Sequence, residues 1–164
     1  MPSEHCAACD ARCCRKYLVA VVPSDVLRIS KRLGKKPIEF LNLFPSEECN
    51  CTWAIPVWVR GKEYYVGLRR ERGQCVFLAP DNRCSIHKFK PLVCSTFPFV
   101  LDGETVVGSN ACPKVWEGGE DHLPALKKYS DELRKMRRKV VAWDWHHSKG
   151  GDLEGLVSFL LRRR

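Results

Sequence analysis

The sequence lacks the features of several common classes of protein. No apolar run approaches the roughly 20 residues that a membrane-spanning helix needs. Residues 1–15 carry cysteines and charges where an export signal would have an apolar stretch. A glycine-rich nucleotide loop, a nucleophile triad signature and a carboxylate pair in a pocket context are also missing. We therefore expect a cytoplasmic protein that does not enter the membrane, and the sequence leaves open whether it is an enzyme.

The chain does have enough apolar content for one hydrophobic core. Hydrophobic residues make up 45% of its 164 residues, and a chain of about this length buries roughly 70% of its unfolded surface. Lysine plus arginine exceed aspartate plus glutamate by 28 − 19 = 9. These proportions predict a single small, basic, globular domain, which we expect to be a monomer.

Ten cysteines are the most informative feature of the sequence. Four of them, near the start, form what we call the knuckle: Cys6, Cys9, Cys13 and Cys14. Two thiols with two residues between them reach one tetrahedral metal ion without strain. The adjacent pair differs, because neighbouring side chains in extended backbone point to opposite sides. We therefore expect Cys13 and Cys14 to serve two neighbouring sites, or two atoms of one cluster.

A second group of candidate ligands lies in the middle of the chain: Cys75, Cys84, His87, Cys94 and Cys112. Cys84 and His87 stand at a Cys-x-x-His spacing, although a structural role for the imidazole is an equal alternative. Phenylalanines and prolines are interleaved with this group and would shield a metal from water, which tunes its redox potential. Arg12 and Arg15, beside the knuckle, would lower the pKa values of nearby thiols.

Two other interpretations of the cysteines compete with metal ligation. Structural disulfides would require an oxidising compartment, and no export signal is visible. Some cysteines could instead be small buried hydrophobic side chains. We favour that second interpretation for Cys49 and Cys51, which lie outside both groups.

The order and spacing of these motifs resemble the YkgJ-type cysteine-cluster family, which has a CxxCxxCC signature and is described as a zinc- or iron-chelating domain. The similarity rests on the knuckle and on four later segments: Gly73–Leu78, Cys84–His87, Lys90–Cys94 and Phe97–Phe99. One departure is visible, because three residues rather than two separate Cys9 from Cys13.

The resemblance implies a set of eight family cysteines: Cys6, Cys9, Cys13, Cys14, Cys75, Cys84, Cys94 and Cys112. Cys49 and Cys51 have no place in that pattern. The family also resembles part of the flagellin lysine N-methylases, which implies that an enzymatic role connected with protein lysine methylation has to be considered.

Cysteine ligation suits zinc and iron–sulfur clusters alike. The aromatic and proline surroundings, the Cys112-Pro113 dipeptide and the basic neighbours favour a [4Fe–4S] cluster over zinc. Three functions remain open: a metal-binding protein whose metal holds the fold, an iron–sulfur enzyme or electron carrier, and a zinc-stapled protein associated with nucleic acid. We favour the first, because no catalytic motif is present.

Residues 1–15 are almost without apolar side chains and yet carry four thiols. Such a segment needs an anchor, and binding free energy at a metal site is largely folding free energy. We therefore predict that both cysteine groups supply ligands, so that the metal ties the knuckle to the segment 75–112.

The remaining pattern predicts an α+β fold, a small single domain with short antiparallel strands and hairpins, metal-stapled loops and C-terminal helices. Within this fold, Ser24 would cap the first helix and Asp102-Gly103 would form the turn of a hairpin. Helices are expected at 25–33 and 37–43, strands at 16–22 and 75–78, and hairpins from 53–59 with 63–69 and 99–101 with 104–107. The candidate ligands would then lie mostly in loops and at strand ends.

We divide the chain into a cysteine-cluster metal-binding part, residues 1–115, and basic amphipathic helices, residues 116–164, packed on the same domain. Apolar residues recur at helical spacing from Leu123 to Trp143, and Asp152 would cap a final helix. Trp143, Trp145, His146 and His147 form a further cluster, in which His146 and His147 could be ligands, but packing at the end of the helix is the favoured interpretation. The opposite face of the long helix is basic: Lys127, Lys128, Arg134, Lys135, Arg137, Arg138 and Lys139. A solvated outer face is the favoured interpretation of this charge, and nucleic-acid binding is the alternative.

Overall fold

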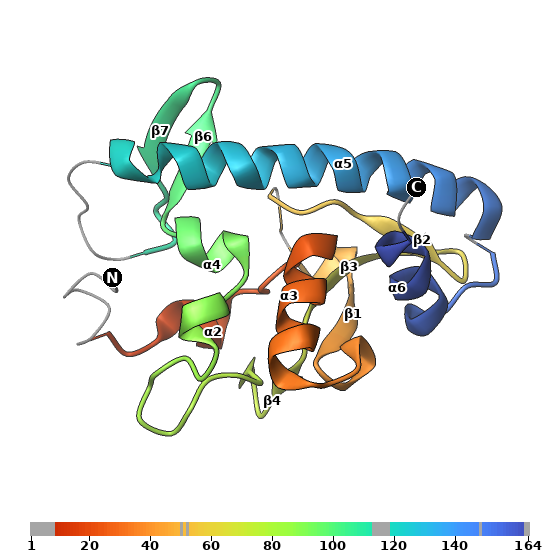
Figure 1. Ribbon diagram of the computed structural model, residues 1–164, viewed down its shortest axis with the longest axis horizontal. Helices are drawn as coiled ribbons and strands as arrows, with labels where there is room; N and C mark the ends of the chain where they lie inside the picture. Colours follow the sequence, from red (N-terminus) through yellow and green to blue (C-terminus); the bar gives the residue numbers. More distant parts are fainter. Residues whose placement is uncertain (1–8, 50, 52, 113–118, 148, 163–164) are drawn as a thin grey trace.

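The computed structural model describes residues 9–49, 51, 53–112, 119–147 and 149–162. One long helix, α5 (Leu123–His147), lies across the rest of the molecule, with short helices and strands packed beneath it (Figure 1). The predicted α+β class, with short antiparallel strands, is confirmed. No helix in the described ranges is both long and apolar enough to cross a membrane.

A three-stranded antiparallel sheet forms the centre of the fold. Its strands are β1 (Leu41–Pro45), β2 (Val57–Val59) and β3 (Lys62–Leu68), in the order β1-β3-β2. The hairpin of β2 and β3 agrees with the predicted one, and it turns at Arg60 and Gly61, which both have positive φ. The adjoining 3-10 turns are η1 (Pro37–Glu39) and η2 (Ser46–Glu48).

The helix expected at 37–43 is wrong. Within residues 37–43, only the 3-10 turn η1 is helical. The chain then continues into β1, where Leu41 pairs with Leu68 of β3. Phe40 and Leu41 are both buried, at 1% and 2% exposure. Burial of these side chains against the sheet outweighs the local helix signal of Pro37, because propensity is a weaker force than tertiary packing.

The prediction of a regular strand at 16–22 is also wrong. Its first residue belongs to helix α2 (Arg12–Lys16), and the following residues run extended beside β3 with one isolated bridge, Ala20 to Gly67. Gly67 is required at this crossing, since a Cβ there would stand 2.4 Å from Leu18 Cδ1 and 2.9 Å from the Val19 carbonyl oxygen.

Helix α3 (Pro23–Leu33) begins before the predicted residue, and Ser24 is not its N-cap. The Asp25 carboxylate accepts a hydrogen bond from Val22 N at 3.2 Å and so satisfies the first turn of the helix. The helix ends at Gly34, whose φ of 64° is the left-handed conformation that favours glycine. The predicted end of the helix is therefore confirmed.

Short elements follow in the cysteine-rich middle of the chain. They are β4 (Arg70–Glu71), β5 (Gln74–Cys75), η3 (His87–Phe89), α4 (Leu92–Thr96), β6 (Phe99–Asp102) and β7 (Thr105–Gly108). The β6–β7 hairpin around Gly103 is confirmed, and it projects from the body beside α5 (Figure 1). The strand expected at 75–78 is limited to Gln74–Cys75, which pairs with β4.

Helix α5 follows the 3-10 turn η4 (Glu120–His122) and packs on the body through one face. Its buried residues are Leu126, Tyr129, Met136, Val140 and Trp143. They face β2, α4 and the last helix, α6 (Leu153–Leu161). Asp152 caps α6 as predicted, with its Oδ1 accepting from Gly155 N at 2.8 Å.

Candidate metal centre

Four segments of the chain bring five of the candidate cysteines to one region. Cys13 and Cys14 lie on α2, Cys75 on β5, Cys84 in the loop after it, and Cys94 on α4. The charge of Cys13 raises the pKa values of Cys75, Cys84 and Cys94, so these thiols are close enough to interact electrostatically. We call these five residues the thiol cluster. It joins thiols of the knuckle to thiols of the second group.

The backbone around Cys13 and Cys14 is helical, which overturns the extended geometry that we expected. Asp10 stabilises the start of α2, since its Oδ1 accepts from Arg12 N at 3.2 Å. Adjacent side chains on a helix are about 100° apart rather than opposed. The two thiols are accordingly close enough for each to shift the pKa of the other. Three of the five cluster cysteines therefore lie on short helices, not in loops or at strand ends.

Helix α4, which carries Cys94, is anchored by a buried carboxylate that our sequence reasoning missed. Asp25 on α3 is fully buried, and its Oδ1 accepts from Leu92 N at 3.1 Å at the start of α4. Arg28 pairs with the same carboxylate at 2.5 Å and also donates to Lys90 O at 2.8 Å. The position of Asp25 in the first turn of a helix was visible in the sequence, but its partner 67 residues away was not.

The two thiols on α2 have opposite acidities. The contact with the Cys14 thiol is the largest cause that lowers the pKa of Cys13 to about 6, and nearby backbone amides and the charge of Lys90 act in the same direction. The same contact raises the pKa of Cys14, and burial raises it further. Burial also raises the pKa of Cys94. Cys13 is therefore the thiol in this cluster that is ionised most readily.

The cations that act on the thiol cluster are not the ones that we expected. Burial raises the pKa values of Cys75, Cys84 and Cys94. Lys90 opposes this rise at Cys84 and Cys94 and helps to lower the pKa of Cys13, and Arg70 opposes the rise at Cys75. Arg12 instead pairs with Asp10 at 3.4 Å, and Arg15 donates to Asn82 Oδ1 at 2.7 Å. Lys90 directly follows η3, and folding brings it to the thiols of α2.

Apolar side chains surround the cysteine-bearing segments, as the sequence indicated. Phe77 and Phe99 are 9% and 5% exposed, and Pro91 and Pro98 are fully buried. The ring of Phe97 lies 6.3 Å from that of Tyr17, just after α2. Cys75 and Phe77 belong to the same hydrophobic core, and Cys14, Cys84 and Cys94 pack against it. Such packing limits the access of water to these thiols, and solvent access is one control on the redox potential and reactivity of a bound metal.

Comparison with known families places this arrangement in context. Residues 5–113 match a family model, CxxCxxCC, described as "Putative zinc- or iron-chelating domain". The chain belongs to this CxxCxxCC family. The match includes the whole thiol cluster and covers about two thirds of the chain. No curated protein and no solved structure matches the chain.

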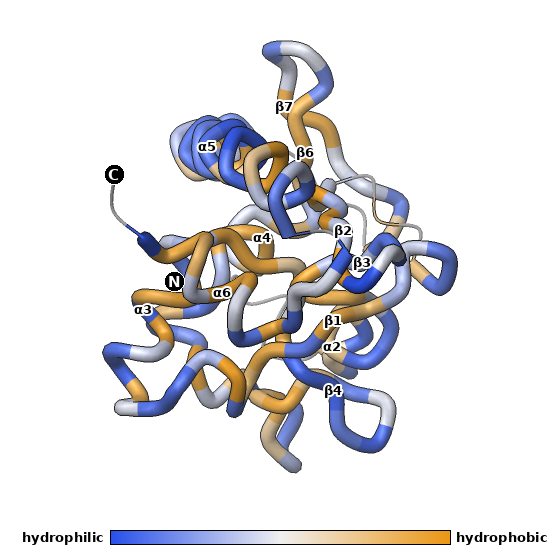
Figure 2. The backbone as a smooth tube through the Cα atoms, turned by 90° about the vertical axis from the view of Figure 1, so that its right-hand side faces the viewer, coloured by the Kyte–Doolittle hydropathy of each residue, from blue (hydrophilic) through white to orange (hydrophobic). Residues whose placement is uncertain are grey.

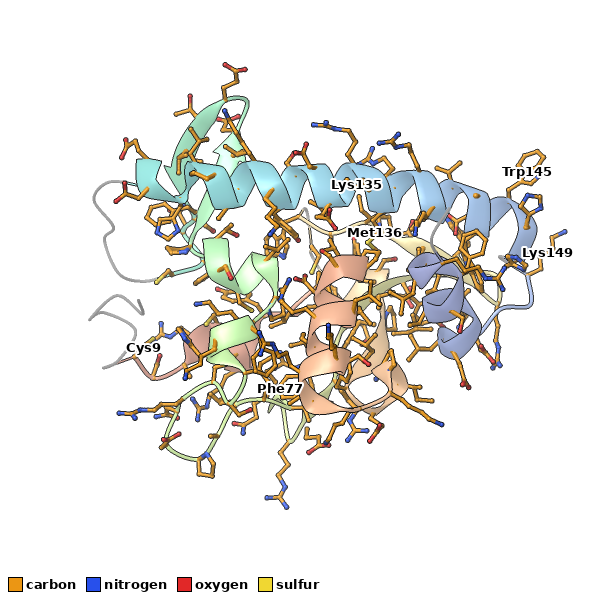
Figure 3. All side chains as sticks on the ribbon, viewed as in Figure 1. Cys9, Phe77, Lys135, Met136, Trp145 and Lys149 are labelled. Atoms are coloured by element: carbon orange, nitrogen blue, oxygen red, sulfur yellow. The ribbon has the colours of Figure 1, made fainter. Side chains whose placement is uncertain are left out.

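The other candidates of the CxxCxxCC pattern lie around the cluster. Cys9 is on the surface, where its thiol donates to Asp10 Oδ1 at 3.7 Å (Figure 3). Cys112 is half-buried, and the preceding residue, Ala111, accepts a hydrogen bond from Tyr17 Oη at 3.0 Å. This bond links the end of α2 to the segment of Cys112. Cys6 lies outside the described residues.

His87 faces a cation. Its Nε2 lies 3.2 Å from Lys90 Nζ, and burial followed by the charge of Lys90 lowers the pKa of the imidazole. A neutral imidazole that accepts from Lys90 would hold the lysine near the thiols. This contact supports the structural alternative for His87 that the sequence left open.

The residue types of the cluster fit the thiolate chemistry of a zinc or iron–sulfur site. All nine described cysteines are free thiols, and soft sulfur ligands suit both kinds of centre. Within the described ranges, however, no three His, Cys, Asp or Glu side chains are already arranged to hold one metal ion. The cluster therefore supplies suitable donors in one region, and their assignment as ligands remains a prediction.

Cys49 and Cys51 form a separate pair near η2. Cys51 N donates to Cys49 O at 2.9 Å, and each thiol acts on the pKa of the other. Cys51 is buried and Cys49 half-buried. Burial raises the pKa values of both thiols, that of Cys51 to about 11.

Proposed function

We propose that this chain is a metal-binding protein whose thiol cluster holds a [4Fe–4S] cluster, with zinc as the alternative metal. The observation that carries the proposal is the convergence of α2, β5 and α4, which gathers cysteines from both groups beside Lys90. Members of the CxxCxxCC family are described as zinc- or iron-chelating, which agrees with a metal as the ligand of these thiols.

The metal would also hold the fold together. The described part of the knuckle segment buries little besides Ala11, at 7% exposure. Thiolates from α2 that share a centre with Cys75, Cys84 or Cys94 would anchor this segment to the sheet and to α4. The free energy of metal binding would then contribute directly to folding. Lys90 and Arg70 would offset the negative charge of such a thiolate centre.

The choice of an iron–sulfur cluster over zinc is supported by the surroundings of the thiols. The buried phenylalanines and prolines exclude water, and nearby cations stabilise an anionic centre. Since zinc bound by four cysteines is structural and has no open position, zinc would make the protein a structural module. An iron–sulfur centre would allow electron transfer as well.

The deciding experiment is metal analysis of the protein purified without oxygen. We expect brown protein with iron and acid-labile sulfide in a ratio near one. Colourless protein with stoichiometric zinc would replace the iron–sulfur proposal by the zinc alternative. Protein that binds neither metal with all thiols reduced would refute the metal-binding function itself.

An enzyme or electron carrier linked to lysine methylation is the second hypothesis, and it rests on the family resemblance. Such an enzyme needs a substrate site beside its metal. One hollow, of about 260 Å³, lies between Trp143 and Phe159 at the far end of α5 from α4 (Figure 1). This hollow lies away from the thiol cluster and so does not supply the substrate site that the second hypothesis needs. We further propose a monomer in the reducing cytoplasm, which gel filtration and thiol trapping in cells would test.

A further inference from the structure

The outward side of α5 is basic for most of its length. Figure 2 shows the helix nearly end-on, and its outer side is largely hydrophilic. Six of the basic residues are exposed: Lys127, Lys128, Arg134, Lys135, Arg137 and Arg138. The seventh, Lys139, is not part of this surface, because its Nζ donates to Leu160 O at 2.6 Å and to Arg162 O at 2.8 Å. Lys139 thus stabilises the end of α6.

Helical spacing arranges part of this surface in a line. At about 100° per residue, one strip lies opposite the buried Tyr129 and Met136. We call it the outer strip, and it consists of Lys127, Arg134, Arg138, Val141 and Trp145. The strip is about 27 Å long at 1.5 Å per residue. Figure 3 shows Trp145 and the nearby Lys149 projecting from the end of α5 into solvent.

The positive charge of this surface is only partly neutralised within the protein. Arg134 pairs with Asp131 at 3.2 Å, and Lys135 pairs with Glu132 at 2.8 Å. The other four exposed cations of the helix have no ion-pair partner within the part of the chain that the structure describes. A line of positive charge that is only partly compensated, on a rigid helix, attracts an anionic partner.

An apolar end follows the cations on the same strip. Trp145 is 85% exposed and Val141 is 65% exposed. Trp143, two residues before Trp145, is buried and donates to Trp58 O at 2.9 Å, so it has a structural role that Trp145 does not share. An exposed tryptophan beside a row of cations offers a flat surface on which a base can stack.

The shape of the surface favours nucleic acid over the other anionic partners. A helix that lies on a membrane inserts a broad apolar face, but that face of α5 is packed against the protein body. A protein interface has an apolar centre with a polar rim, whereas the apolar residues here stand at one end of the row. A single strand matches both parts, because its phosphates meet the cations and an unpaired base meets the indole.

We propose that the outer strip of α5 binds single-stranded nucleic acid, with phosphates along Lys127 to Arg138 and a base stacked on Trp145. This role is separate from the proposed metal binding and does not depend on it. The test uses the metal-loaded chain as purified and fluorescence anisotropy with labelled oligonucleotides of about 15 nucleotides. The probes are oligo-U RNA, oligo-dT DNA and a DNA duplex of equal length.

We expect binding of one or both single strands at low salt, weaker binding of the duplex, and a steep loss of affinity as salt rises. A preference between RNA and DNA would identify the source of the ligand. Absence of binding to every single strand at low salt would overturn the proposal. Binding only to vesicles that contain phosphatidylserine, measured in parallel, would also overturn it in favour of a membrane surface.

Two variants separate the two parts of the strip. The change Trp145→Ala should weaken binding about fivefold or more, and Trp145→Phe should restore most of the affinity, because a phenyl ring still stacks. The double change Lys127→Gln/Arg138→Gln should lower the salt slope by about 1.4, at about 0.7 for each phosphate contact.

The matched control is Arg32→Gln/Lys35→Gln, which removes two exposed charges at the end of α3. It should leave both affinity and slope near the values of the unmodified chain. Equal losses in the control and in the strip variant would refute the assignment to α5. All of these positions are exposed, so unchanged thermal melting is expected for each variant.

Discussion

Two pairs of cysteines in this protein make the same local contact in opposite surroundings. The thiols of Cys13 and Cys14, and those of Cys49 and Cys51, lie close enough for each to shift the pKa of the other. In the first pair the backbone amides of α2 and the charge of Lys90 help to lower the pKa of Cys13 to about 6. In the second pair both pKa values are raised, and Glu48 adds to the effect of burial at Cys49.

The comparison shows that a thiol pair becomes a candidate ligand pair through its neighbours. Metal ligands must be deprotonated, and a helix that presents amides and a facing lysine favour the thiolate. Cys13 and Cys14 also lie near three more thiols, while the causes that shift Cys49 and Cys51 include no cysteine beyond the pair. The same residue type therefore serves different purposes about 35 residues apart.

The largest expected difference between the two pairs is in metal content. The change Cys94→Ser removes a thiol from the cluster. We expect this variant to lose most of its metal and to have a lower melting temperature. Cys9→Ser should show the same direction. The matched control, Cys49→Ser, should keep the metal content and the melting temperature of the unmodified chain. Metal analysis and thermal melting check this prediction, and a Cys94→Ser protein that keeps full metal and an unchanged melt would contradict the shared site.

The next effect concerns the support of the cluster. The change Asp25→Ala removes the carboxylate that joins α3 to the start of α4, and it leaves Val22 N and Leu92 N without their acceptor. We expect a loss of about 3 kcal/mol in the free energy of unfolding. Asp152→Ala, which removes a surface cap, should cost only about 1 kcal/mol. Urea denaturation of both variants measures the contrast, and equal losses would refute the anchoring role of Asp25.

The difference in acidity gives a third prediction, for the metal-free, reduced chain. Because the pKa of Cys13 is lowered to about 6, its thiolate is the main form above that pH. Alkylation of Cys13 by iodoacetamide should therefore reach half of its maximal rate near pH 6. Cys51, with its pKa raised to about 11, should react only at strongly alkaline pH, and Cys49, whose pKa burial also raises, should need a higher pH than Cys13. Peptide mass spectrometry of samples quenched across the pH range reads out each site, and a common pH profile for all three thiols would contradict the comparison.

The smallest effect, on the alkylation of Cys13, is expected from replacing Lys90. The change Lys90→Gln removes the positive charge that helps to lower the pKa of Cys13 and that opposes the effect of burial at Cys84 and Cys94. We expect the alkylation profile of Cys13 to move to higher pH by a few tenths of a unit. Lys88→Gln, on an exposed lysine two residues away, is the matched control. A profile of Cys13 that moves equally in both variants would show that general charge, and not Lys90, sets its acidity.

Particular elements show why part of the fold was predictable. The β6–β7 hairpin follows from Asp102-Gly103, because Gly103 adopts the positive φ that the turn requires. Helices α5 and α6 follow from apolar residues at helical spacing and from the cap at Asp152. These elements depend on turn residues, caps and the spacing of apolar residues within one segment, and all three can be read from the sequence.

Other elements depended on contacts that local patterns do not contain. Leu41 lies in strand β1 because it pairs with Leu68 of β3, although the sequence around Pro37 indicated a helix. Arg12 and Arg15 were adjacent to the knuckle in sequence, yet Lys90 acts on Cys13. Asp25 supports Cys94 through a hydrogen bond to Leu92 across 67 residues. A local sequence pattern does not show which side chains from distant parts of the chain will lie in contact after folding.

The sequence alone determined that this is an α+β domain of the CxxCxxCC family, because the order of its cysteines and its hydrophobic periodicity are properties of the chain itself. Only the tertiary structure decided which thiols meet, which cation lowers their pKa values, and that Lys139 leaves the basic face to stabilise α6. The physical reason is that electrostatic and hydrogen-bonding partners are fixed by distance in space, and the chain reaches those distances only when its core is packed.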